Sequence, residues 1–354
     1  MKTTITGLIR SSPRVLVLGD ITPASLAPAD PDKPALIPQM HNRITLFPTL
    51  SSLAERDPRE AGRLLSLLES IYDGRFRRDT AQGTREYIVD TVVIGTLTPE
   101  VYENRFLSAM ISYGSRFLIF RYTPPDELSR KVSQIFEHAA SERVLKVLRE
   151  DTSSKLTEAL DTIARKDIDS VIIPPDLKED LETLGELLAK LRIIFRQVKY
   201  YDSGSGRWIT EIEVSQYDVP IRSTLQLKIF AKCNALIRNV PKIVGLPVVD
   251  ERAVRLAARL ALGGSYGTMT QLLLEIARST TAVSQRALAA ILKLSPSTVN
   301  RYLKAMHQVG VLLSADPPII ESKYLKVVRK YLAKVPNIAQ NGSNGSDEEN
   351  NDGV

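Results

Sequence analysis

Apolar positions recur at spacings of three and four residues in two short runs between Ser284 and Leu313, which is the periodicity of helices with one buried face. Ser284 precedes the first run as a helix N-cap. Ser295 followed by Pro296 marks the start of the second, because proline fits the first helical position. The apolar positions are Ala287, Leu288, Ile291 and Leu292 in the first run, and Val299, Leu303 and Met306 in the second. The pattern predicts two helices joined by a tight turn at residues 293–294.

The outward face of the second helix carries short polar groups followed by two cations. These residues are Ser295, Ser297, Thr298, Asn300, Arg301 and Lys304. Hydroxyl and amide groups at the N-terminal end of a helix can reach base edges in a major groove, while Arg and Lys neutralise phosphates. We therefore predict that these residues contact DNA. An ordinary amphipathic helical hairpin with a solvated polar face is the alternative.

The stretch resembles the helix-turn-helix of winged-helix domains, in which a Ser-x-x-Thr-Val-x-Arg-x-Leu-like helix precedes a glycine and an apolar pair. The residues that follow the helix here are Gly310, Val311, Leu312 and Leu313. One position departs from the commonest motif, since Lys293 stands in the turn where that motif has glycine. The resemblance implies a first helix within 263–279, wing strands at 311–313 and 318–320, and a closing basic helix over 322–335.

Upstream, short apolar runs alternate with helical and loop segments. Strands are predicted at 14–20, 43–47 and 87–97, a helix at 51–72, and an exposed loop or hairpin at 75–85. The first strand ends in Asp20, as the magnesium-binding strand of a Walker B element does. This alternation of strands and helices predicts an α/β core.

The order of short motifs in this part resembles the second half of an AAA+ ATPase core, as found in helicase-like proteins of phages, plasmids and archaeal mobile elements. The matching residues are Tyr72, Asp73 and Gly74, then Thr96, Thr98 and Pro99, then Gly114, Arg116, Phe117 and Leu118. The resemblance implies that Arg116 is an arginine finger, which acts on the nucleotide of a neighbouring subunit. A generic three-layer α/β core with a structural arginine is the alternative.

Residues 220–261 are predicted to form two helices joined by a loop. The apolar face expected on the first helix consists of Leu225, Leu227, Ile229, Phe230, Leu236 and Ile237. The segment resembles the lid of the minichromosome maintenance and related helicases. That resemblance implies that Arg222 or Arg238 senses nucleotide, whereas a surface cation on a helix is the alternative.

The chain lacks the parts that would bind ATP. A P-loop needs Gly-x-x-x-x-Gly-Lys-Ser/Thr, yet none of the 18 glycines is followed by lysine. Pro48 and Thr49 stand where the AAA+ family has its magnesium-binding acid. We therefore expect no cofactor and no autonomous ATPase activity. ATP and magnesium would be bound only if a P-loop ATPase subunit is a partner. A homo-oligomer is the alternative assembly.

Between these parts, residues 125–196 read as helical, with a break at Pro174 and Pro175. Alternating residues on both sides of a Ser-Gly-Ser-Gly turn then predict a β-hairpin. Near its tip are Lys199, Tyr200, Tyr201, Arg207 and Trp208. Such groups could stack on and neutralise single-stranded DNA, or they could be cross-strand packing pairs.

Composition narrows the class of protein. The 354 residues are 43% hydrophobic and 25% charged, as in an ordinary soluble protein, and no apolar run reaches the roughly 18 residues that span a bilayer. A single cysteine, Cys233, excludes an internal disulfide, and three scattered histidines compose no zinc site. We expect a cytoplasmic protein without membrane contact or a metal site.

Charge favours a polyanion as partner. Residues 284–334 hold nine Lys or Arg against two acids, so their net charge of +7 exceeds the +6 of the whole chain. The polar segment 336–354 holds four acids and no base, and it is predicted to be disordered. Residues 1–335 therefore carry 47 cations against 37 acids, a net of +10.

Together these features predict a helix-rich α/β protein in four segments. They are a partial AAA+-like α/β core (1–124), a helical region with a β-hairpin and lid-like helices (125–262), a winged helix-turn-helix (263–335) and a disordered acidic tail (336–354). The leading hypothesis is a DNA-binding protein of replicative helicase or initiator ancestry that binds duplex DNA through the winged helix. A subunit of a split ATP-driven helicase that supplies Arg116 in trans, and a winged-helix transcriptional regulator, are the alternatives.

Overall fold

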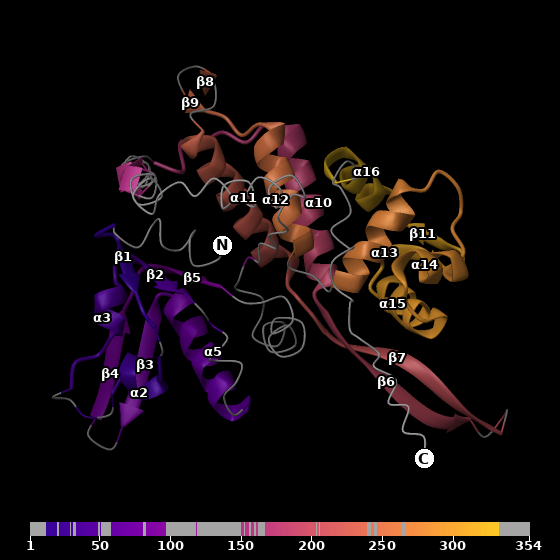
Figure 1. Ribbon diagram of the computed structural model, residues 1–354, viewed down its shortest axis with the longest axis horizontal. Helices are drawn as coiled ribbons and strands as arrows, with labels where there is room; N and C mark the ends of the chain where they lie inside the picture. The colour runs from indigo at the N-terminus through magenta and orange to yellow at the C-terminus, as the bar shows by residue number, and fades with distance from the viewer. Residues whose placement is uncertain are drawn as a thin grey trace, which may run out of the picture.

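The computed structural model describes two parts of the chain, each with its own hydrophobic core (Figure 1). The described residues are 12–19, 21–28, 30, 33–48, 50, 58–80, 83–96, 118, 150–151, 153–155, 157–158, 161, 167–202, 204, 206–238, 242–243, 246–263 and 267–332. The predicted acidic tail and Asp20 therefore lie outside the described residues, and the bounds of the four predicted segments stay predictions.

Residues 12–96 form a small α/β unit around three parallel strands. The strands are β1 (Val15–Val17), β2 (Arg43–Phe47) and β5 (Thr91–Gly95), in the order β1-β2-β5. The helices are α2 (Pro23–Leu26), α3 (Ile37–Met40) and α5 (Pro58–Tyr72). Phe47 of the sheet and Leu64 and Leu68 of α5 are buried in one core. The α/β class is as predicted, while the AAA+ identity of this unit stays a prediction.

A basic antiparallel hairpin follows α5. It consists of β3 (Arg75–Thr80) and β4 (Gly83–Ile88), and the chain enters it through Gly74, whose φ of +80° suits glycine. The hairpin alternative for the segment 75–85 is thus correct. The single strand expected at 87–97 is wrong, because β4 pairs with β3 and ends at Ile88, whereas β5 pairs with β2.

Three helices form a bundle in the second part of the chain. They are α10 (Pro175–Leu191), α11 (Pro220–Ile237) and α12 (Glu251–Gly263), with the short strands β8 (Lys242–Ile243) and β9 (Leu246–Pro247) between the last two. Pro174 is extended and Pro175 begins α10, which confirms the predicted break. Helix α10 approaches α11 closely at Gly185, where an added Cβ would lie 2.2 Å from Thr224 Oγ1.

Two expectations for the bundle are wrong. The helix predicted to continue to residue 196 ends at Leu191, because residues 193–202 pair with residues 207–217 as strands. The apolar face of α11 is also narrower than expected. Its buried stripe passes through Leu227, Ala231 and Ala235, whereas three residues of the expected apolar face are exposed: Leu225, Ile229 and Ile237.

A long two-stranded ribbon leaves the bundle between α10 and α11. Its strands are β6 (Ile193–Asp202) and β7 (Arg207–Tyr217), which confirms the predicted hairpin. Arg192 lies directly before β6 and Asp218 directly after β7, and their side chains form an ion pair of 3.6 Å that is almost fully buried. Asp218 also accepts a hydrogen bond from Ser223 of α11 at 2.9 Å. The two ends of the ribbon are therefore held together inside the bundle.

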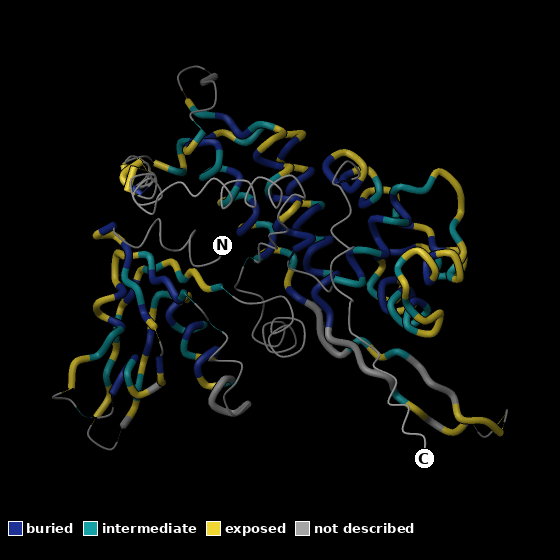
Figure 2. The backbone as a smooth tube through the Cα atoms, in the orientation of Figure 1, coloured by how far each residue is buried: buried dark blue, intermediate teal, exposed yellow. Residues whose placement is uncertain are grey.

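The last elements form a winged helix. They are α13 (Gly267–Arg278), α14 (Gln285–Leu292), α15 (Pro296–Gln308), the wing strands β10 (Leu312–Ala315) and β11 (Pro318–Ile320), and α16 (Ser322–Tyr331). These elements share one hydrophobic core with the bundle, and the buried positions continue from one to the other (Figure 2). The predicted wing strands and closing helix are confirmed over the described residues.

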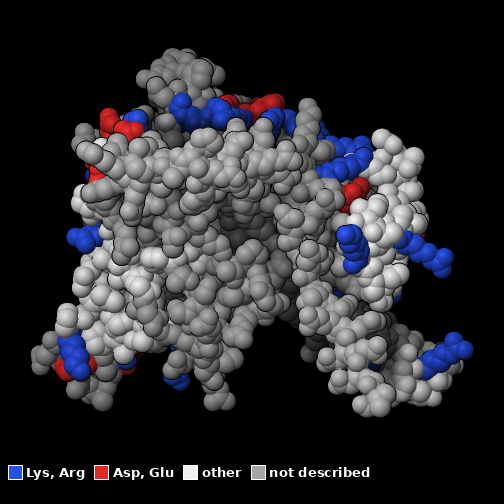
Figure 3. Space-filling model, in the orientation of Figure 1, with Lys and Arg blue, Asp and Glu red and all other residues white. Residues whose placement is uncertain are grey.

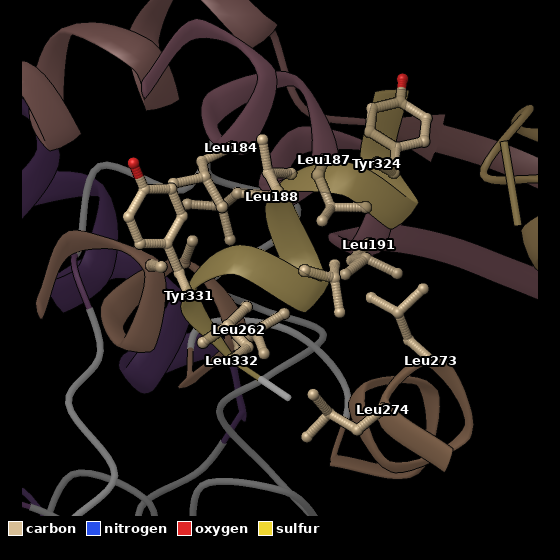
Figure 4. Close-up of a cluster of buried hydrophobic side chains, with 14 of the residues drawn as sticks. Leu184, Leu187, Leu188, Leu191, Leu262, Leu273, Leu274, Tyr324, Tyr331 and Leu332 are labelled. Atoms are coloured by element: carbon tan, nitrogen blue, oxygen red, sulfur yellow. The ribbon is translucent and has the colours of Figure 1, made fainter. Parts of the chain in front are cut away.

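Helix α16 is fixed to α10 by two similar sets of contacts. Tyr324 donates a hydrogen bond to Glu186 at 2.7 Å, and Tyr331 donates one to Asp180. Each carboxylate also receives a lysine of α16 at 2.7 Å, namely Lys323 and Lys330. The tyrosine rings lie beside the leucines of α10, including Leu184, Leu187 and Leu188 (Figure 4). Aromatic burial and charge-assisted hydrogen bonds thus act at the same interface.

The contacts of Glu186 lead to a pH-dependent prediction. Burial opposes its ionisation, but hydrogen bonds from Lys323, Tyr324 and Lys190 outweigh burial and lower its pKa below the ordinary 4.5. A carboxyl with a lowered pKa stabilises the folded state above its unfolded pKa, and this contribution is lost as the pH falls through the folded value. Glu186→Gln should therefore lower the free energy of unfolding by about 1–2 kcal/mol at neutral pH.

Urea unfolding at a series of pH values measures this effect. The difference between the wild type and Glu186→Gln should shrink below pH 4.5. Glu182→Gln is the matched control on the same helix, because Glu182 is half-exposed in its ion pair with Lys228 and should contribute less than about 1 kcal/mol. An equal loss in both variants would contradict a special role for Glu186.

Candidate nucleic-acid interface

Both helices of the helix-turn-helix begin at the predicted caps. The Ser284 hydroxyl accepts a hydrogen bond from the backbone N–H of Ala287 at 3.2 Å, and the Ser295 hydroxyl accepts one from that of Thr298 at 3.1 Å. Pro296 occupies the first position of α15, where no intrahelical N–H is needed. Local sequence alone thus fixes where each helix starts.

The turn between α14 and α15 explains why its position favours glycine. Lys293 has a left-handed backbone, with φ 53° and ψ 41°. The N–H of Leu294 bonds back to the carbonyl of Ala289 at 2.9 Å, which is the pattern of a Schellman motif. Helix α15 ends in the same pattern at Gly310, whose φ is +71°. The chain therefore turns at Lys293 as it would at a glycine, with some backbone strain.

Helix α15 divides into the two faces that the sequence predicts. Val299, Leu303 and Met306 are fully buried. On the opposite side Ser295, Ser297 and Lys304 are exposed, and Thr298, Asn300 and Arg301 are half-buried. Helix α14 fits its prediction less well, since Leu288 is buried but Ala287 and Ile291 are exposed.

Three hydroxyl groups gather at the N-terminal end of α15. The Ser295 hydroxyl lies 2.9 Å from that of Ser297 and 2.8 Å from that of Thr298. Hydroxyl groups can both donate and accept hydrogen bonds. This end of the helix also carries partial positive charge from the backbone dipoles. The arrangement suits contact with base edges or with a phosphate oxygen.

Arg301 is held differently from Lys304. Its guanidinium lies 5.3 Å from the centre of the Tyr302 ring, a cation–π contact. Its Nε is enclosed and hydrogen-bonds to no atom of the part of the chain that the structure describes. Lys304, one turn closer to the C-terminus, is exposed. Of the two predicted phosphate contacts, Lys304 is therefore the one that projects into solvent.

Three of the cations between residues 284 and 334 make contacts inside the protein. Lys323 and Lys330 pair with Glu186 and Asp180. Arg329 donates to the carbonyls of Ala277 and Ser279 at 2.9 and 3.1 Å. Within residues 284–332, which the structure describes, four other cations are exposed: Arg286, Lys293, Lys304 and Lys326. Figure 3 shows blue side chains projecting from the winged helix on one face of the molecule.

Two ribbons flank α15. The wing contacts it through β10, and the β6–β7 ribbon contacts it through β7. Residues 312–320 of the wing contain Asp316 and no Lys or Arg. The position of the longer ribbon beside α15 was not expected from the sequence. Nothing in the local pattern of residues 193–217 indicates which helix, about ninety positions away, it will meet.

The residues that carry the AAA+ resemblance are described only in part, and Arg116 lies outside the described residues. Arg222 lies near the start of α11 and Arg238 just after its end, about 24 Å apart along a helix. Arg238 donates to Asp250 at 2.9 Å, and the same carboxylate oxygen caps α12 through the backbone N–H of Ala253. For Arg238 the structure thus provides an ion pair within the bundle, and nucleotide sensing by either residue stays a prediction.

Among the described residues, no helix is long and apolar enough to cross a membrane. Nor does any group of three or more His, Cys, Asp or Glu side chains in that part of the chain have the arrangement of a metal site. Cys233 lies in α11, where burial raises the pKa of its thiol.

Comparison with known families agrees with the geometry of the C-terminal part. Residues 271–312 match the family described as winged helix-turn-helix DNA-binding domains. The match runs from α13 through α14 and α15 to the first residue of β10. None of the curated proteins compared with the chain matches it. The chain therefore contains a C-terminal winged helix-turn-helix DNA-binding domain.

The left-handed backbone at Lys293 generates a stability prediction. A side chain in this conformation costs about 1–2 kcal/mol, and glycine avoids that cost but loses about 0.4–1 kcal/mol through the greater freedom of the unfolded chain. Lys293→Gly should therefore raise the free energy of unfolding by roughly 0.5–1 kcal/mol. Lys293→Ala removes the same charge without relieving the backbone. Thermal unfolding that gives equal stability for both variants would rule out strain at this turn.

Proposed function

We propose that the chain binds duplex DNA with the N-terminal end of α15 in the major groove. The observation that carries this proposal is the division of α15 into a fully buried face and an outward face of hydroxyl groups followed by Lys304. Because its apolar face is packed in the core, the helix can present its polar face to a groove without changing conformation. The major groove of B-DNA is wide enough to accept such a helix.

The outward groups divide into two kinds of contact. Ser297, Thr298 and Asn300 can hydrogen-bond to base edges or to the backbone, which gives register and selectivity. Lys304, with Arg286 and Lys293 from the neighbouring helix and turn, can neutralise phosphates on either side of the groove. The latter contacts release counterions, so we expect affinity to fall steeply as the salt concentration rises.

For the wider role we infer a replication protein of helicase or initiator ancestry. Support comes from the sequence resemblance of residues 72–74 and 96–118 to an AAA+ core and of residues 220–261 to a lid. It also comes from the three-stranded parallel sheet, which is compatible with such a core. A transcriptional regulator would use α15 in the same way. Footprints at a palindromic promoter site would favour the regulator, whereas binding at an origin would favour replication.

The split-helicase alternative depends on Arg116 and on a P-loop partner. If it holds, the DNA-stimulated ATPase rate of a mixture with that partner should fall when Arg116 is replaced by alanine. An unchanged rate would remove this alternative while leaving DNA binding by α15 intact.

Substitution of the exposed cation tests the proposed contact. Lys304→Ala should weaken binding to duplex DNA several-fold at low salt, and it should reduce the slope of log K against log salt by about one. The double variant with Arg301→Ala should weaken binding further, although it also removes the contact with Tyr302. Fluorescence anisotropy of a labelled duplex measures both effects.

Lys326→Ala is the matched control. Lys326 is also an exposed lysine of the winged helix, but it lies on α16, away from α15 (Figure 1). Its removal should change the affinity by less than twofold. Equal effects of Lys304→Ala and Lys326→Ala would mean that DNA is attracted by net charge rather than bound at α15.

A further inference from the structure

The β6–β7 ribbon is built as a fixed arm rather than a loose loop. The buried pair of Arg192 and Asp218 joins its two ends, and breaking a buried ion pair costs about 3–5 kcal/mol. Further out, Ile212 and Val214 of β7 pack against the core that contains α15. In Figure 1 the ribbon passes α15 and extends beyond it. Its tip therefore has a defined position relative to the helix-turn-helix.

The side of the ribbon that meets the core also carries its exposed aromatic pair. Side chains alternate along a strand, so Trp208 shares a face of β7 with Ile212 and Val214. The backbone register pairs Trp208 with Tyr201 and Thr210 with Lys199, which places Tyr201 and Lys199 on this same face. The face that rests on the core near its base thus becomes, near the tip, an aromatic and cationic surface.

The aromatic pair is open to solvent. Trp208 is 70% exposed and Tyr201 is 56% exposed. Their ring centres lie 5.6 Å apart with the rings edge to face, so the cross-strand packing pair expected from the sequence does form. That contact leaves most of the indole uncovered. A large aromatic group at the end of a fixed arm is suited to contact with a base or a sugar.

The acids of the ribbon share one face with two of its three cations, Arg196 and Arg207. Residues 193–217 hold three cations and three acids, so their net charge gives no attraction to DNA. The register positions of all three acids, Asp202, Glu211 and Glu213, belong to the face opposite Trp208. The aromatic face carries Lys199 and no acid. The wing on the other flank of α15 carries Asp316 and no cation, so the ribbon is the better of the two for contact with a polyanion.

The reach of the arm matches the geometry of a duplex. Trp208 lies four residues beyond Ile212, a distance of about 13 Å along a strand. Half a helical turn of DNA, which separates a major groove from the next minor groove along the axis, is about 17 Å. The two lengths are of the same order.

We propose that the β6–β7 ribbon is a second DNA contact, whose Trp208–Tyr201 pair enters the minor groove next to the major groove that holds α15. Lys199 on the same face neutralises a phosphate at the edge of that groove. This inference rests on the proposed binding of duplex DNA by α15. It extends the interface along the DNA by half a turn, to a part of the chain outside the winged helix-turn-helix.

The single tryptophan of the chain makes the proposal directly testable. A labelled duplex of about 30 base pairs, long enough for both contacts, is titrated with the full chain while anisotropy reports binding and tryptophan fluorescence reports the tip. Binding should change the emission of Trp208 and protect it from acrylamide quenching. A single strand of the same length is the comparison ligand.

Three variants measure what the contact contributes. Trp208→Ala should weaken duplex binding about tenfold, within the range of an aromatic contact with a base, and Trp208→Phe should restore part of the loss. Glu213→Ala on the opposite face of the ribbon should change the affinity by less than twofold. Trp208 is exposed, so Trp208→Ala should lower the thermal stability by no more than the contribution of its cross-strand pair with Tyr201, and Trp208→Phe by less.

The outcomes separate this proposal from the one on which it rests. In one outcome the duplex binds and loses affinity with Lys304→Ala, while the emission of Trp208 and its quenching by acrylamide stay unchanged. That result would show that α15 contacts DNA and the ribbon does not. Protection by the single strand alone would also overturn the minor-groove assignment. If no duplex binding is detected, or if it ignores Lys304→Ala, it is the contact of α15 that fails.

Discussion

Two hydrogen-bonded tyrosines on α16 connect the winged helix to α10 of the helical bundle. Tyr324 and Tyr331 are buried against α10 and donate to Glu186 and Asp180. Asp180 is buried and Glu186 is half-buried, so a buried carboxylate or tyrosine hydroxyl left without its partner would be costly. The two sets of contacts therefore hold the winged helix against the bundle.

Helix α10 also positions the β6–β7 ribbon of the proposed interface. The same helix that holds α16 ends at Leu191, where Arg192 and the buried ion pair begin the β6–β7 ribbon. The ribbon and α15 consequently take their positions from one element, and β7 contacts α15 directly. A duplex bound by α15 would meet an arm already in place, so the ordering cost of a second contact would be small.

The distribution of charge shows why a net value is a coarse guide to a binding surface. The sequence places a net charge of +7 between residues 284 and 334, yet Lys323, Lys330 and Arg329 serve contacts inside the protein. The ribbon, whose net charge is zero, separates its acids from its aromatic face. The ion pairs of α16 thus leave fewer of its cations for a DNA surface, and the sorted acids make the ribbon the proposed second contact, which its composition gave little reason to expect.

Local signals in the sequence determined the helix-turn-helix itself. Ser284, Ser295 and Pro296 fix the helix starts, and apolar spacing fixes the buried face of α15, because capping and amphipathic periodicity act within a few residues. The α/β class of the first unit and the existence of the β6–β7 hairpin followed in the same way, whereas the single strand expected at 87–97 did not. Only the tertiary structure decided that the hairpin lies beside α15, that Lys323 and Lys330 of α16 pair with α10, and that α11 exposes Leu225 and Ile229. Those outcomes depend on pairings between residues tens to hundreds of positions apart, which no local pattern encodes.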